Sequence, residues 1–555
     1  GRLGSMTTPR GTTTYAYSST TGNLATISAP DGNTLSYTYD GSLPLSVAYS
    51  GIVNGTVSQT YNNNFWTISQ SINGSSPIAF TYDNDGLLTK AGSLVIQRDA
   101  VTGFSKGTTL GNATMAFTYN TFGELITSTA KYSTTTYLSD QYTYDKLSRI
   151  TQKTETTQSG TDQFDYSYDL AGRLTEVKKN GAVISTYTYD ANGNRLSRVA
   201  SAGTEMGTYD DQDRLLIYGN FTYSYTANGE LKNKKDTSTG QTTQYDYDLL
   251  GNLIKVVLPD GKQIEYIIDG QNRRVGKKIN DTLVQGFLYE DQLNPVAELD
   301  GSNAIVSRFV YGSKYHVPDY MIKGGATYRI ISDHLGSVRM VVDISNGAVA
   351  QKIEYDEFGR ILSDTNPSFQ PFGFAGGIND QHTFLTRYGY RDYDAFIGRW
   401  TAKDPIRFAS GDTNVYGYVV NDPVNWIDSF GLSKGGKQRI DGDDPLMDPN
   451  KIKEIEKALN DPNVSLARKA RLRAWLKVFK RGGLMGVVAS IGIGLLAGES
   501  IADTLDPLAP TDAGGYGDMI EDYPDENNNG IPDKYDIPEG TDSNTFCASD
   551  LQWYK

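Results

Sequence analysis

Short stretches in which aromatic and polar residues alternate dominate most of the chain. In Tyr187-Thr188-Tyr189-Asp190 the two tyrosines lie two residues apart, so they share one face of an extended strand. A turn signal follows, in which the aspartate bonds to its own backbone and Gly193 supplies a positive φ. Leu196 then begins a return strand. The pattern therefore predicts β-hairpins.

The same pattern recurs as a repeat. Aspartates 145, 169, 190 and 210 are 24, 21 and 20 residues apart, which fits two short strands and two turns per unit. One unit cannot bury its aromatic face alone, so neighbouring units must stack and bring their tyrosine rings into a ladder. Because the tyrosines are periodic, we interpret them as packing residues rather than as a carbohydrate platform. Clear copies carry Tyr-Asp at 82–83, 144–145, 168–169, 189–190, 247–248 and 355–356, and degenerate copies lie at 119–120 and 225–226.

Composition excludes several classes of function. The formal net charge of −14 over 555 residues argues against nucleic acid or an anionic membrane as a partner of the repeat region. Cys547 is the single cysteine, so neither an internal disulfide nor a cysteine-based zinc site can form. The three histidines are His316, His334 and His382, which excludes a Ser-His-Asp triad or a multi-histidine metal site after residue 432. We interpret His334 as a structural turn residue, with a general base as the alternative.

Residues 331–432 carry further motifs, and these end in the strongest change of composition in the chain. After Leu432 the tyrosine–glycine repeat stops. The motifs are Asp333-His334-Leu335-Gly336-Ser337-Val338-Arg339, Arg391-Asp392-Tyr393-Asp394, Gly398-Arg399-Trp400, Asp404-Pro405, Asn414-Val415-Tyr416-Gly417-Tyr418 and Asp428-Ser429-Phe430-Gly431-Leu432.

These motifs and the repeats resemble the RHS/YD-repeat family, which includes teneurins and the C subunits of insecticidal toxin complexes. The resemblance covers residues 11 to 432 and implies an all-β fold, in which a strip of β-hairpins spirals into a hollow shell closed by a plug. It places the YD-repeat shell at 7–330, the RHS-associated core at 331–432 and a variable tail at 433–555. We interpret residues 1–6 as a cloning remnant and expect the chain to be a fragment of a longer protein.

In many members of this family the core is an intramolecular aspartyl protease that cuts after the terminal leucine. The resemblance places the cut between Leu432 and Ser433 and matches the two catalytic carboxylates to Asp404 and Asp428. Two carboxylates held close together cannot both ionise, so one can act as the base and the other as the acid. Asp392 is a further candidate, and Arg391 is a candidate charge partner that holds a carboxylate ionised.

Two positions depart from the family pattern. Relatives have glycine where Arg407 stands and proline where Ser429 stands. Neither change removes a carboxylate, although the loss of proline could loosen the turn at the cut. The competing interpretation is that Asp404 and Asp428 only form turns in a plug that does not cleave. We expect Gly431 to allow a sharp bend next to the cut.

The tail has three features. Residues 449–481 fit two helices, the second of them basic, and 482–498 form an uncharged run that is either a membrane contact or a buried segment. Residues 525–536 resemble a calcium loop, with glycine at the sixth position, although an aspartate ends the loop where EF-hands have glutamate. The competing interpretation is a solvated acidic linker. The expected calcium ligands are Asp525, Asn527, Asn529, Asp533 and Asp536.

Two functional hypotheses follow. In the first, the chain is a secreted, RHS-type toxin carrier that encloses its own tail as cargo, cuts it free after Leu432 and delivers it to a target cell. A shell-closing partner, or the missing N-terminal part, would complete the container. In the second, the chain is an extracellular structural or adhesion shell that stays whole and displays a calcium-stabilised tail. No enzyme activity can be assigned to the tail.

Overall fold

A single antiparallel sheet makes up most of the computed structural model, which describes residues 2–410 and 412–432. Thirty-five strands follow one another, and each pairs with the next in the chain. A second sheet of four short strands and three 3-10 helices follow it. The predicted all-β fold of stacked hairpins is therefore confirmed. Among the described residues no helix is long and apolar enough to cross a membrane.

The strands of the large sheet run from β1 to β35. The first half comprises β1 (Ser5–Thr8), β2 (Gly11–Tyr17), β3 (Leu24–Ser28), β4 (Thr34–Asp40), β5 (Leu43–Ser50), β6 (Gly55–Tyr61), β7 (Thr67–Ile72), β8 (Ser75–Tyr82), β9 (Leu88–Ala91), β10 (Leu94–Arg98), β11 (Ser105–Leu110), β12 (Ala113–Tyr119), β13 (Leu125–Tyr132), β14 (Thr135–Tyr144), β15 (Ile150–Thr157), β16 (Gly160–Tyr168), β17 (Leu174–Lys179) and β18 (Ala182–Tyr189). The second half comprises β19 (Arg195–Ala200), β20 (Gly203–Tyr209), β21 (Leu215–Tyr218), β22 (Phe221–Tyr225), β23 (Leu231–Asp236), β24 (Thr242–Tyr247), β25 (Leu253–Val257), β26 (Gln263–Ile268), β27 (Arg274–Ile279), β28 (Thr282–Tyr289), β29 (Pro295–Leu299), β30 (Ile305–Val310), β31 (Tyr320–Lys323), β32 (Ala326–Ser332), β33 (Val338–Asp343), β34 (Val349–Tyr355) and β35 (Ile361–Asp364). The later elements are η1 (Phe374–Gly376), β36 (Ile378–Asn379), β37 (Leu385–Tyr388), β38 (Arg391–Asp394), β39 (Arg399–Trp400), η2 (Arg407–Ser410) and η3 (Val419–Asn421).

The aspartate of each repeat organises the turn that follows it. In the turn after β8, Oδ1 of Asp83 accepts the backbone N–H groups of Asp85 at 3.0 Å and Leu87 at 2.9 Å. The carbonyl of Asp83 accepts the N–H of Gly86, whose φ is +82°. The repeat aspartate thus satisfies the backbone of a turn that would otherwise be unpaired, as the sequence predicts.

The tyrosine before each aspartate connects its hairpin to the preceding one. The hydroxyl of Tyr168 donates to the carbonyl of Ile150, and that of Tyr189 donates to the carbonyl of Leu174, both at 2.7 Å. The guanidinium of Arg149 also lies 4.7 Å from the ring centre of Tyr168. The expected ring-to-ring contacts do occur, as between Trp66 and Tyr82 at 5.1 Å, but hydroxyl bonds and cation–π contacts join other hairpins.

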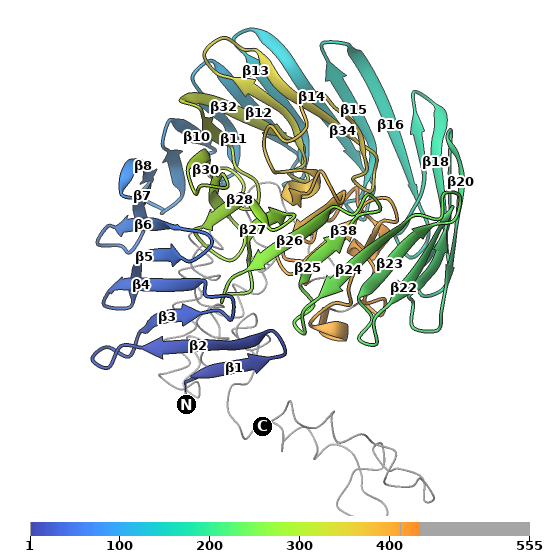
Figure 1. Cartoon of the computed structure of the whole chain (residues 1–555). Coiled ribbons are helices and arrows are strands. Elements are labelled where there is room, and N and C mark those ends of the chain that lie inside the picture. The colour runs from blue at the N-terminus through green and yellow to red at the C-terminus, as the bar shows by residue number, and fades with distance from the viewer. Residues whose placement is uncertain (1, 411, 433–555) are drawn as a thin grey trace, which may run out of the picture.

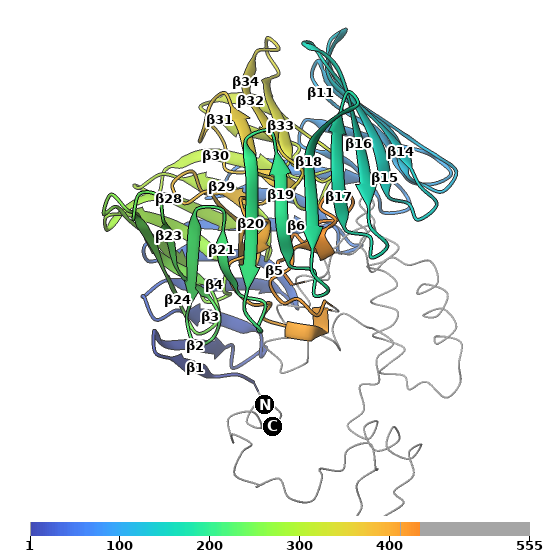
Figure 2. The ribbon, with the colours of Figure 1, turned by 90° about the vertical axis from the view of Figure 1, so that its right-hand side faces the viewer.

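The strip winds back on itself, so that its second half packs on its first (Figures 1 and 2). Side-chain hydrogen bonds mark where the two windings meet, and the difference in residue number between the bonded partners falls along the strip. It is 240 for Tyr49 and Tyr289, 229 for Ala91 and Tyr320, 221 for Thr108 and Arg329, and 184 for Glu155 and Arg339. The winding therefore tightens toward the end of the sheet, which is the spiral that the family resemblance implies.

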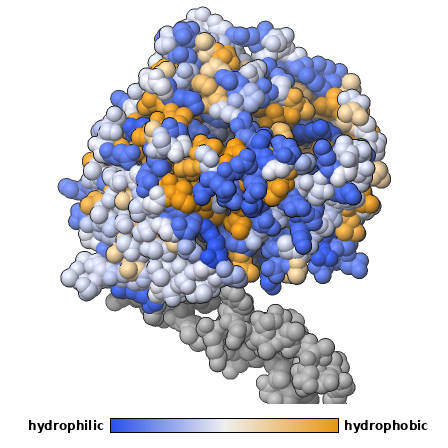
Figure 3. Space-filling model, in the orientation of Figure 1, coloured by the Kyte–Doolittle hydropathy of each residue, from blue (hydrophilic) through white to orange (hydrophobic). Residues whose placement is uncertain are grey.

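Much of the core segment (residues 366–432) lies within the curve of the strip, where the ribbon in Figure 1 turns orange. Its side chains bind the aspartate turns and the strand ends next to them. Asn425 accepts the N–H of Ile150 at 2.7 Å, and the hydroxyl of Tyr416 donates to the carbonyl of Gly229 at 2.7 Å. Hydrophobic side chains gather toward the middle of the face drawn in Figure 3, among hydrophilic ones. The large sheet itself continues past residue 330 to Asp364, so the predicted boundary at 330 lies within β32.

Candidate active site

Arg391 is the centre of a buried polar cluster in the core segment. It begins β38, and its side chain is almost completely buried. Its Nη2 atom binds Oδ2 of Asp404 at 2.9 Å and Oδ2 of Asp428 at 3.2 Å. A buried guanidinium needs such partners, because burial lowers the pKa of Arg391 while the two carboxylates oppose that effect.

Trp400 packs against the guanidinium group of Arg391. The guanidinium carbon of Arg391 lies 4.2 Å from the centre of the Trp400 ring, and Trp400 in turn packs against Tyr388 and Tyr418. An aromatic face attracts a cation and restricts its side chain to one orientation. The aromatic cluster therefore fixes the position of the Arg391 nitrogen that binds both carboxylates. We call Asp404 and Asp428 the carboxyl pair.

Asp404 is a buried carboxyl with a raised pKa. Burial raises its pKa to about 6, against the opposing charge of Arg391 and the hydrogen bond from the N–H of Ile406. A carboxyl with this pKa carries its proton in mildly acidic solution, where an ordinary aspartate has lost it. The site can thus hold one protonated carboxyl beside a second carboxyl.

The end of the described chain lies directly against this cluster. The N–H of Leu432 donates to Oδ1 of Asp428 at 3.1 Å, and Nε of Arg391 donates to the carbonyl of Gly431. Gly431 has a φ of +70°, and a Cβ there would come within 2.7 Å of the carbonyl oxygen of Tyr388. Gly431 therefore allows the sharp bend that the sequence predicts, at a place where no side chain fits.

Asp392, the further catalytic candidate, lies in a different cluster. It follows Arg391 on β38, so its side chain points to the opposite side of the strand. Its carboxylate binds Arg274 and Arg387, both at 2.9 Å. The structure brings together Arg391, Asp404 and Asp428, and it holds Asp392 apart from them.

The other predicted site residues also have definite places. His334 is half-buried and bonds through Nε2 to the carbonyl of Val424 at 2.8 Å, so its ring is a donor that ties a turn to the core segment. Burial lowers its pKa, which favours the neutral ring. Ser433, the calcium candidates Asp525, Asn527, Asn529, Asp533 and Asp536, the helices expected at 449–481 and the apolar run 482–498 lie outside the described residues.

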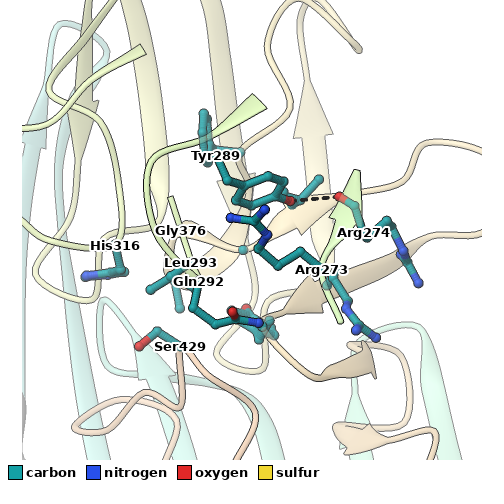
Figure 4. A pocket seen from close by; sticks show the side chains of 15 residues that line it. Arg273, Arg274, Tyr289, Gln292, Leu293, His316, Gly376 and Ser429 are labelled. Carbon is teal, nitrogen blue, oxygen red and sulfur yellow. Dashed lines mark hydrogen bonds between the residues drawn. The ribbon is translucent and has the colours of Figure 1, made fainter. Parts of the chain in front are cut away.

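A small cavity adjoins the turn that leads to Leu432 (Figure 4). It has room for about one water molecule, with about 20 Å³ open to it. Ser429 lies at its edge, and Tyr289, His316 and Gln292 are among the other residues that line it. Burial lowers the pKa of His316 to about 4, so this ring is neutral at ordinary pH. Neither Asp404 nor Asp428 lines this cavity.

Tyr315 is a contact that the sequence did not indicate. Its hydroxyl lies 2.8 Å from Oγ of Ser429, in the turn that leads to Leu432. Tyr315 is 114 residues earlier in the chain, and no local motif marks it. Only the spiral, which returns the strip to the core segment, brings the two side chains together.

Comparison with known proteins identifies the fold. A family model described as the teneurin YD-shell matches residues 1–424. Human teneurin-4 is 30% identical over 297 residues, which cover 51% of this chain and 10% of teneurin-4. Double-stranded DNA deaminase toxin A of Burkholderia cenocepacia is 25% identical over 334 residues, which cover 53% of this chain and 22% of that toxin.

Solved structures show the same architecture. The structure of TcdB2-TccC3 without its hypervariable C-terminal region superposes with a TM-score of 0.54 at 16% identity, covering 76% of this chain and 26% of that one. A second TcdB2-TccC3 structure gives a TM-score of 0.53. This chain spans only about a tenth to a quarter of the length of these proteins. Because the family model covers most of the sequence and the spiral of hairpins agrees with it, the chain belongs to the teneurin YD-shell family, as its RHS/YD-repeat motifs indicate.

Proposed function

We propose that this shell carries the residues after 432 as cargo and cuts them free by an intramolecular aspartyl reaction. The observation that carries the proposal is the nitrogen of Arg391 that joins Asp404 and Asp428 beside Leu432. The bond that breaks is the amide between Leu432 and Ser433. Since the chain cuts itself once, this would be a single-turnover reaction.

The two carboxyls would divide the work of hydrolysis. Asp428, ionised, takes a proton from a water molecule, and the oxygen of that water attacks the carbonyl carbon of Leu432. Asp404, protonated because burial raises its pKa to about 6, donates to the carbonyl oxygen and then supplies the proton that the departing nitrogen of Ser433 needs. The products are a carboxyl end at Leu432 and an amino end at Ser433.

Support for a toxin cargo comes from the relatives. One relative is a double-stranded DNA deaminase toxin, and one related structure is defined by the lack of a hypervariable C-terminal region. We propose the corresponding arrangement here: a secreted or cell-surface shell, its own tail as cargo and a further protein segment that closes the container. For the tail we propose calcium at 525–536 and membrane contact at 482–498, which calcium titration and vesicle binding of the full chain would test.

The mass of the denatured protein tests the cleavage. We expect wild type to give two pieces, one ending at Leu432 and one beginning at Ser433. Asp404→Asn and Asp428→Asn should each leave one intact chain, because an amide cannot perform the acid or base step. Asp392→Asn serves as a matched control, since it alters a buried aspartate that is held outside the carboxyl pair.

The alternative function is a shell that stays covalently whole and displays its tail. One observation favours it: Arg391 already forms ion pairs with both Asp404 and Asp428, so the cluster would also be stable as a purely structural plug. An intact wild-type chain of 60.8 kDa would select this alternative.

A further inference from the structure

Both members of the carboxyl pair begin a turn that shares part of the hydrogen bonding of the turns that close the repeats. The carbonyl of Asp428 accepts the N–H of Gly431 at 3.3 Å, and the carbonyl of Asp404 accepts the N–H of Arg407 at 2.9 Å. In each turn Oδ1 of the aspartate accepts one further N–H, from Leu432 at 3.1 Å and from Ile406 at 3.0 Å. Asp83 in the shell makes the same bonds, to the third residue and to the second and fourth residues after it.

The fourth position explains why these two turns meet. In several shell turns an arginine there binds Oδ2 of its own aspartate, as Arg173 binds Asp169. The fourth residues after Asp404 and Asp428 are Phe408 and Leu432, whose side chains have no donor for a carboxylate. Both Oδ2 atoms are therefore available to the nitrogen of Arg391.

The third position distinguishes the two turns from each other. It has a positive φ in all of these turns, +82° at Gly86, +70° at Gly431 and +51° at Arg407. Glycine adopts this conformation without strain, whereas any side chain with a Cβ pays a steric cost. The side chain of Arg407 is exposed, so its effect on the turn comes through the backbone.

We propose that the cleavage centre consists of two repeat turns that face each other across Arg391, and that Arg407 is a positioning residue that limits how well Asp404 is presented. The inference rests on the proposed cleavage. Without strain at residue 407, the turn should populate one conformation more fully. The carboxyl of Asp404 should then be positioned for proton transfer for a larger fraction of the time. The cut should then become faster.

Three variants test this idea by the rate at which the two pieces appear. Arg407→Gly removes the strain, and we expect it to raise the rate at least about threefold. Arg407→Ala removes the same charge but keeps a Cβ, so its rate should stay near that of wild type. Ser148→Gly is the matched control, because Ser148 is the third residue of the Asp145 turn and has a φ of +60°. It should raise thermal stability without changing the rate of cleavage.

The outcomes separate the two proposals. A faster cut in Arg407→Gly alone supports the role of Arg407, and so does a wild type that stays whole while Arg407→Gly splits. A wild type that splits as fast as Arg407→Gly overturns the role of Arg407 but leaves the cleavage proposal standing. Equal acceleration by Ser148→Gly also overturns it, because general stability would then be the cause. If neither wild type nor Arg407→Gly splits, both proposals fall.

Discussion

Leu432 donates its backbone N–H to the side chain of Asp428, 3.1 Å away. The residue before the proposed cut is thus bound by a member of the carboxyl pair, and the bend at Gly431 makes this contact possible. The residue to be cut and the carboxyl pair belong to one chain and already lie together in the fold, so cleavage needs no binding step.

Cleavage should slow as the pH rises through about 6. Asp404 is the acid in our proposal, and burial raises its pKa to about 6, so its protonated fraction falls above that pH. We expect the rate of splitting to fall by about tenfold for each pH unit above this value. The rate should be followed by mass from about pH 5 to about pH 8, with the unfolding temperature recorded alongside. A rate that rises over this range would contradict Asp404 as the acid.

Tyr315→Phe should slow cleavage without unfolding the protein. The change removes only the hydroxyl that lies 2.8 Å from Oγ of Ser429, so the turn before the cut loses one hydrogen bond to the strip. We expect a loss of about threefold to tenfold in rate, which corresponds to about 1 kcal/mol. Ser429→Ala should have the same effect, and the double variant should be no slower than either single one. Additive losses would show that the two hydroxyls act separately.

The folded shell should be less stable at alkaline than at acidic pH because of Asp422. Its buried carboxyl bonds to Asn425 at 2.7 Å, and burial raises its pKa to about 7. A raised pKa means that the folded chain holds the proton more tightly than the unfolded chain does. The resulting stability is full below the ordinary pKa of aspartate and is lost as the pH rises through about 7.

Thermal unfolding from about pH 5 to about pH 8 measures this effect. Wild type should lose several degrees of Tm over the range, and Asp422→Asn should lose less, because its side chain has the same shape but no proton to release. An identical slope for the two proteins would exclude Asp422 as a source of the pH dependence.

Asp83→Ala should destabilise the shell by about 1–3 kcal/mol, because the N–H groups of Asp85 and Leu87 lose their shared acceptor. Asp85→Ala is the control in the same turn, since the side chain of Asp85 accepts neither of these bonds. It should change the free energy of unfolding by less than about 0.5 kcal/mol. Urea denaturation of the two variants beside wild type provides the comparison.

The sequence predicted the local features of this protein well. The hairpins, the aspartate turns and the positive φ of glycines such as Gly86 follow from residue types and spacing alone. The pair Asp404 and Asp428 came from family motifs, and the structure places both on Arg391. Such turns can be predicted from sequence because the residues that determine a turn lie within about five positions of one another.

The long-range features could not be predicted in this way. Asp392 was a candidate because it is an aspartate next to Arg391 in the sequence. The alternation of side chains along β38 nevertheless directs it toward Arg274 and Arg387. Tyr315 reaches Ser429 only because the strip returns to the core segment. The spiral decides such contacts, and no short pattern records its winding.

Because the spiral tightens, the length of the strip between two windings determines which residues meet. Tyr49 meets Tyr289 after 240 residues, while Glu155 meets Arg339 after 184. A hairpin inserted between two such partners would shift every later residue by one repeat, and the polar side chains that now meet would face the wrong neighbours. Each winding should therefore contain the same number of hairpins in different homologues. Homologues should vary in length at the ends of the strip or in loops that leave the sheet.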